Sequence, residues 1–105
     1  MNKIAKLNDA FRSTFQGGRV VTTATVASLP EATKAKVLET VRTFSAFTHD
    51  NDPYGEHDLA IFEVDGERFM FKIDYFDKTM EFGSEDPANP DVTLRVLTMM
   101  LASDY

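Results

Sequence analysis

The stretch LAIFEVDGERFMFKIDYF, residues 59–76, decides the fold of this chain. Apolar and polar residues alternate in both halves, and Asp65-Gly66 lies between them. Alternation is typical of a strand with one buried face, and an Asp-Gly pair favours a two-residue hairpin turn. The stretch therefore predicts a β-hairpin. In its second half one face carries Phe69, Phe71, Ile73 and Tyr75, and the other carries Arg68, Met70, Lys72, Asp74 and Phe76.

The residues after the hairpin predict a short strand, a loop and a last helix. Residues 79–82 follow a turn and would extend the hairpin into a meander, and residues 83–90 form an acidic loop. Asn89 can cap a helix over 90–103, with Pro90 in its first turn. Because apolar residues occupy most sides of that helix, we expect it to be the central buried one. Its apolar residues are Val92, Leu94, Val96, Leu97, Met99, Met100 and Leu101.

The residues before the hairpin predict two helices and one strand. A helix over 3–15 has its apolar residues three and four apart, and Gly17-Gly18 would end it. A β-branched run predicts a strand near 19–26. Ser28 and Glu31 have the spacing of a capping box, which would begin a helix over 29–47.

This order of elements predicts an α+β fold in one domain spanning residues 1–105. An antiparallel sheet, made of the meander 59–82 and the strand near 19–26, would pack against helices 3–15, 29–47 and 90–103. Leu97 and Phe71 should be buried where the last helix meets the hairpin. A chain with 43% hydrophobic residues can fill such a core.

Composition excludes several classes of protein. The chain has no Cys, which excludes disulfides, thiolate catalysis and Cys-ligated metal centres. No window approaches the roughly 18 apolar residues of a membrane span, and the N-terminus has no secretory signal pattern. We therefore expect a cytoplasmic protein that does not contact a membrane.

The charges are strongly segregated along the chain. The net charge is −6, but residues 1–49 sum to +4 and residues 50–91 sum to −10. The acidic segment holds thirteen Asp and Glu residues against three Lys and Arg residues. Because phosphate binding needs clustered Lys and Arg, direct binding to nucleic acid is disfavoured. An acidic segment instead predicts either a solubilising face or a surface complementary to a basic partner.

The densest polar cluster, DNDPYGEHD at 50–58, resembles a calcium loop only in part. Counted from Asp50, the third and sixth positions fit an EF-hand, but Tyr54 and Ile61 stand where the fifth and twelfth ligands belong. His57 between two carboxylates could act as a general base, but the sequence shows no partner nucleophile. No phosphate-binding or nucleophile motif occurs elsewhere. We therefore expect no cofactor, no metal and no catalytic residue.

Several motifs together resemble a bacterial family of short acidic proteins, a domain of unknown function found mainly in proteobacteria and often on plasmids or other mobile elements. They are DNDPYGEHD (50–58), KIDYFD (72–77), FGSEDP (82–87), RVLTMMLASDY (95–105), LNDAFR near the start and GGRVVTTA (17–24). The chain departs from the family at Leu59 and Ala60, where an aromatic residue and a Gly are common. The resemblance implies no reaction, cofactor or catalytic residue. Its mobile-element context raises the hypothesis of an inhibitor of nucleic-acid-binding defence systems, of the anti-CRISPR or anti-restriction type.

The sequence thus predicts a non-enzymatic protein that binds a basic protein surface, in the manner of a nucleic-acid mimic. The expected contact residues are Asp50, Asp52, Glu56, Asp58, Glu85, Asp86 and Asp91. Two alternatives remain open. One is a metal-binding or metal-assisted enzyme that uses Asp50, Asp52, Glu56, His57 and Asp58. The other is a housekeeping domain whose acidic face only keeps it in solution.

Overall fold

The computed structural model describes residues 1–105 and contains the predicted hairpin. Strand β2 (Leu59–Val64) pairs antiparallel with β3 (Glu67–Phe76), with Val64 opposite Glu67. Asp65 and Gly66 have φ angles of 51° and 81°, the left-handed values that this kind of turn requires. The Asp65 carboxylate accepts hydrogen bonds from the side chains of Thr33 and Lys36, which ties the turn to a helix.

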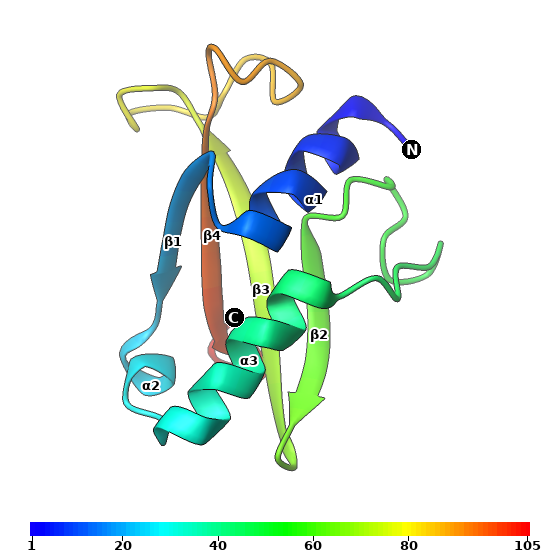
Figure 1. Ribbon diagram of the computed structural model, residues 1–105. Coiled ribbons are helices and arrows are strands. Elements are labelled where there is room, and N and C mark those ends of the chain that lie inside the picture. The colour runs from blue at the N-terminus through cyan, green and yellow to red at the C-terminus, as the bar shows by residue number, and fades with distance from the viewer.

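The sheet has four strands and is mixed, not purely antiparallel. Strand β4 (Leu94–Leu101) pairs antiparallel with β3, and β1 (Gly18–Thr22) pairs parallel with β4. The strand order is therefore β1-β4-β3-β2 (Figure 1). The expected strand near 19–26 is present but short, because Thr23 caps a new helix, α2 (Ala24–Ala27), which the sequence analysis missed.

The predicted helix 90–103 is wrong, because this segment forms β4. Apolar residues on all sides are compatible with a buried helix and equally with a strand that is covered on both faces. β4 lies between β1 and β3, and its residues are buried on the helix side (Leu97, Met99) and on the other side (Val96, Met100). Pairing on both edges satisfies its backbone, so the segment needs no helical hydrogen bonds.

The predicted third strand of the meander at 79–82 is also wrong. These residues form a closed turn, and only an isolated bridge between Phe76 and Gly83 continues the ladder. The physical reason is Asp77, whose carboxylate accepts hydrogen bonds from the backbone N–H groups of Thr79 and Glu81. An Asp side chain that satisfies nearby amides in this way competes with strand pairing.

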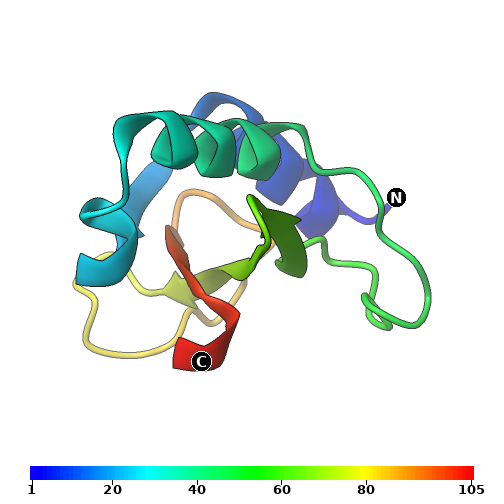
Figure 2. The same ribbon diagram turned by 90° about the horizontal axis from the view of Figure 1, so that it is seen from below.

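Helices α1 (Lys3–Thr14) and α3 (Glu31–Thr43) cover one face of the sheet (Figure 2). Asn2 caps α1 through the backbone N–H of Ala5, and the helix ends at Phe15 in a left-handed conformation rather than at Gly17-Gly18. α3 is shorter than the predicted 29–47 and has no capping box. The Ser28 hydroxyl instead donates to carbonyl oxygens of α2, so it is not available to cap α3.

The core lies between the helices and the sheet. Leu97 and Phe71 are both fully buried, as expected, but Leu97 is part of the sheet rather than of a helix. The buried cluster consists of Phe11, Val26, Val37, Val41, Ala60, Phe62, Val64, Phe69, Phe71, Ile73, Leu97 and Met99. None of the helices is long and apolar enough to cross a membrane.

Candidate functional site

The two acidic segments lie at the same end of the sheet. The first acidic loop (residues 50–58) leads into β2, and the second acidic loop (residues 83–91) leads into β4. In Figure 1 the first loop lies to the right of β2 and the second lies above the ends of β3 and β4. Helix α1 passes between the two loops, so each loop contacts a different flank of that helix.

Asp52 shapes the first acidic loop from inside. Its residue is only 9% exposed, although its neighbour Asp50 is exposed. The Asp52 carboxylate accepts hydrogen bonds from the backbone N–H groups of Glu56 and His57, each at 3.2 Å. A charged acceptor that satisfies two loop amides holds the backbone in one conformation. Asp52 therefore supports the loop, and only a small part of it is exposed.

His57 connects the first acidic loop to α1. Its Nδ1 lies 2.9 Å from an Asp9 oxygen, and Arg12 donates to that same oxygen at 2.8 Å. The other ring nitrogen lies 3.7 Å from Asp52. The His57 ring also stacks on Phe47, with the ring centres 4.1 Å apart. The contacts of His57 with Asp9, Asp52 and Phe47 therefore hold the loop against the helix.

Glu56 joins a partly buried polar cluster that connects both acidic loops. The Tyr75 hydroxyl donates to the Glu56 carboxylate at 3.1 Å and accepts from the Asn8 amide at 2.8 Å. Asn8 in turn accepts from Arg95 Nε at 2.8 Å, and Arg95 donates through Nη2 to the carbonyl oxygen of Pro87. Burial raises the pKa of the Tyr75 hydroxyl, so this group stays a protonated donor. The cluster thus fixes one loop relative to the other.

The carboxyl group of Asp58 is a weaker acid than that of an exposed Asp. Burial raises the pKa of its carboxyl group, and the nearby carboxylates of Glu56, Asp52 and Asp74 raise it further. Its backbone carbonyl accepts from the N–H of Ile73 at 2.7 Å, at the start of the hairpin. Asp58 therefore belongs to the support of the loop as much as to its surface.

Four of the seven predicted contact residues present free carboxylates to solvent. Asp50, Glu85, Asp86 and Asp91 are exposed, and none of them forms an ion pair with Lys, Arg or His. Only Asp86 uses its carboxylate locally, accepting from the backbone N–H of Ala88 at 3.2 Å. These four residues are the exposed part of the predicted site, whereas Glu56 and Asp58 are partly exposed and Asp52 is buried.

The side chains of the alternative metal site do not converge. No group of three His, Asp or Glu residues is arranged to hold a metal ion. Asp52 is directed at backbone amides, His57 at Asp9, and Glu56 at Tyr75. Three of the five side chains of the alternative metal site are therefore engaged within the protein, and Asp50 is free in solvent.

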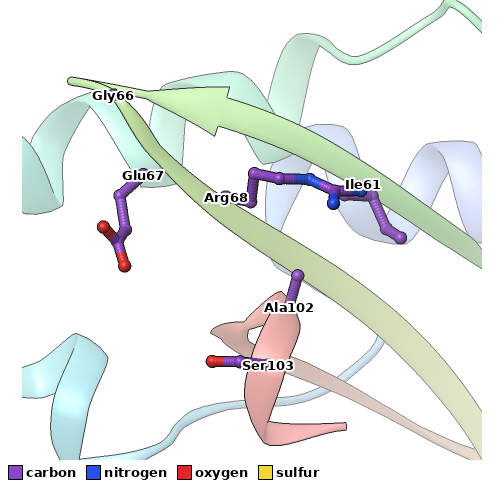
Figure 3. A pocket seen from close by; sticks show the side chains of 6 residues that line it. All are labelled: Ile61, Gly66, Glu67, Arg68, Ala102 and Ser103. Carbon is purple, nitrogen blue, oxygen red and sulfur yellow. The ribbon is translucent and has the colours of Figure 1, made fainter.

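The face of the sheet opposite the helices has no comparable site. A hollow there is lined by residues of the hairpin and of the short helix η1 (Ala102–Asp104), shown in Figure 3. The Arg68 side chain extends towards Ile61, and the Glu67 carboxylate points away from both of these side chains. Met70 and Met100 are also buried, although neither belongs to the core cluster beneath the helices. No polar groups converge in the hollow.

Sequence reasoning missed the residues that support the two loops, namely Asn8, Asp9, Arg12, Tyr75 and Arg95. A partial signal exists in α1. Asn8 and Arg12 are four residues apart and lie beside Phe11 on the buried face of that helix, where polar side chains are uncommon. Two polar residues on an apolar helix face indicate a buried hydrogen-bonded cluster. Their partners are distant in sequence and carry no such signal.

Comparison with known proteins identifies a family but no function. Residues 22–104 match the family described as Protein of unknown function (DUF3768). The match covers most of the chain, and the chain belongs to this family. No curated protein and no solved structure matches it. The bacterial family proposed from the motifs agrees with this result in being a domain of unknown function.

Proposed function

We propose that this protein binds a basic surface of another protein through Asp50, Glu85, Asp86 and Asp91. The observation that carries the proposal is that all four carboxylates are exposed and unpaired in a chain that has Lys and Arg elsewhere. Unpaired carboxylates at one end of the molecule create a negative potential that attracts Lys and Arg and accelerates encounter with them.

The support of the loops favours the same role. The clusters around Asp52 and Tyr75 hold the backbones of both acidic loops in place before any partner arrives. A preorganised surface loses little conformational entropy on binding, so more of the interaction energy appears as affinity. Asp52, the one buried member of the predicted set, then acts on binding only through the loop conformation.

We further propose that the partner is a nucleic-acid-binding protein and that the carboxylates occupy its phosphate-binding groove. Such a groove concentrates Lys and Arg, which is the complement of the second acidic loop. An inhibitor of a nucleic-acid-binding defence system would work in this way. The protein and the nucleic acid would then compete for the same site, while the protein itself would have no affinity for DNA or RNA.

The decisive experiment neutralises exposed carboxylates without touching the fold. Glu85→Gln with Asp91→Asn removes two charges whose side chains make no hydrogen bond, and Glu39→Gln with Asp104→Asn removes two equally free charges elsewhere. Binding to a partner isolated by affinity capture should weaken severalfold in the first double variant, mostly through slower association at low salt.

The control double variant should bind like the parent protein, because it changes net charge by the same amount at distant positions. Equal weakening of binding in both double variants would show that only net charge matters. Binding like the parent in both would show that Glu85 and Asp91 make no contact, and either result would contradict the proposed surface. Added DNA should displace the protein from the partner in the inhibitor version of the proposal. A complex that contains this protein, its partner and DNA together would contradict competition for one groove and would leave only the proposal that this protein binds another protein.

A further inference from the structure

An exposed aromatic side chain stands beside the second acidic loop. Phe82 is 71% exposed, although a Phe side chain is among the most costly to leave in water. Val92 is 42% exposed and lines the same hollow as Phe82, together with Asp77, Gly83 and Glu85. Met80, in the same turn, is 38% exposed. Phe82 and Val92 therefore share one hollow at the acidic end of the molecule, and Met80 is exposed in the adjoining turn.

The turn that carries Phe82 is held rigidly. The backbone N–H of Asp77 donates to the Phe82 carbonyl oxygen at 2.9 Å, which closes the turn. The Asp77 carboxylate accepts from the backbone N–H groups of Thr79 and Glu81 and from the Thr79 hydroxyl. Although burial opposes it, these hydrogen bonds lower the pKa of Asp77, so the carboxylate stays ionised as their acceptor.

Met80 adopts a conformation that supports this interpretation. Its φ is 60°, in the left-handed region that residues other than Gly seldom occupy. The turn keeps this conformation because its hydrogen bonds fix both sides of it. A local conformational cost combined with an exposed Phe is typical of a segment shaped for contact and not for packing.

The charges around Phe82 specify the kind of partner. Residues 77–91 contain five acidic residues and one basic residue, Lys78. None of these acidic side chains forms an ion pair. An apolar side chain in a hollow that acidic residues also line matches a protein surface on which Lys and Arg lie beside an apolar pocket. Interface hot spots have a similar anatomy, with a buried aromatic anchor inside a polar rim.

We infer that Phe82 is the anchor of the interface and inserts into an apolar pocket of the basic partner, with Glu81, Glu85 and Asp91 contacting the Lys and Arg residues around it. This inference rests on the proposed function and adds a contact that charge alone does not supply. The carboxylates govern the rate of encounter, and Phe82 governs the lifetime of the complex.

The test uses two synthetic peptides with the same number of lysines. One is an amphipathic lysine–leucine helix, and the other replaces each leucine by serine. The parent protein should bind the leucine peptide more tightly than the serine peptide. Phe82→Ala should reduce binding to the leucine peptide on the order of tenfold, equivalent to about 1.4 kcal/mol. It should leave binding to the serine peptide unchanged.

Tyr105→Ala is the matched control, because Tyr105 is a similarly exposed aromatic residue (76%) outside the acidic end. It should keep the preference for the leucine peptide, and unchanged melting temperatures should show that both variants are folded. A preference that survives Phe82→Ala would overturn the anchor. If the parent protein instead shows no salt-dependent binding to either peptide, the proposed function is contradicted. Failure of the anchor and failure of the proposed function therefore give different results.

Discussion

Replacing Asp52 by Ala tests the separation between supporting and exposed carboxylates. Asp50 and Asp52 are two residues apart in one motif, but Asp50 is exposed with no hydrogen bond from its side chain, and Asp52 is buried. The Asp52 carboxylate accepts from two backbone amides at 3.2 Å. Its removal leaves those amides without an acceptor. Asp9 is then the only carboxylate beside the His57 ring.

The expected loss of stability follows from these contacts. A buried donor left without a partner costs about 1–3 kcal/mol. Because the loop can open and admit water, the cost of both amides together should be about 2 kcal/mol. For a domain of this size 1 kcal/mol shifts the melting temperature by roughly 4–8 °C, so the shift for Asp52→Ala should be roughly 8–16 °C.

The assay is thermal or urea unfolding of three variants. Asp50→Ala should stay within about 0.5 kcal/mol of the parent, as expected for an exposed residue without contacts. Asp52→Asn keeps one acceptor oxygen and should lie between Asp50→Ala and Asp52→Ala. Equal stabilities of Asp50→Ala and Asp52→Ala would refute the assignment of Asp52 as the support of the first acidic loop.

Four further perturbations test the fold, its electrostatics and the alternative metal site. Leu97→Ala removes a fully buried side chain of β4 and should cost about 2–5 kcal/mol in urea unfolding; an unchanged midpoint would contradict the placement of β4 at the centre. Gly18→Ala should also destabilise strongly, because a Cβ there would collide with the carbonyl oxygen of Arg95. Asp58→Asn should stabilise the protein at neutral pH. A raised pKa means that folding disfavours the ionised form of this acid, so stability is lost as pH rises from the unfolded pKa through the folded one. The gain from Asp58→Asn should therefore shrink in acid, and a gain independent of pH would contradict its electrostatic origin. Added Ca²⁺, Mg²⁺, Mn²⁺ or Zn²⁺ should leave the melting temperature unchanged, whereas a saturating metal site would raise it by a shift equivalent to about 2.7 kcal/mol at 100 times its dissociation constant.

The elements predicted correctly depend on neighbours in sequence. The hairpin follows from alternation and from Asp65-Gly66, whose left-handed conformations only a few residue types accept. The first helix follows from spacings of three and four. In these cases the hydrogen bonds that define the element join residues close together in the chain.

The last segment was mispredicted because its pattern has no single local solution. Residues 94–101 are apolar on every side, and such a run suits a buried helix or an inner strand. The choice is made by β1 and β3, which pair with its two edges. The parallel pairing of β1 with β4 is likewise decided by partners 77 residues apart, as between Gly18 and Arg95.

For the candidate site, too, some properties follow from the sequence and others only from the tertiary structure. The sequence by itself determined that the acidic residues are concentrated in 50–91, that Asp65-Gly66 makes a turn, and that Cys chemistry is absent. Only the tertiary structure decided which carboxylates are free. Asp9 meets His57 across 48 residues, and Arg95 meets Asn8 across 87. The charge of a side chain is a property of its type, but its burial and its partners depend on which distant segments fold against it, and so Asp50 and Asp52 have different roles.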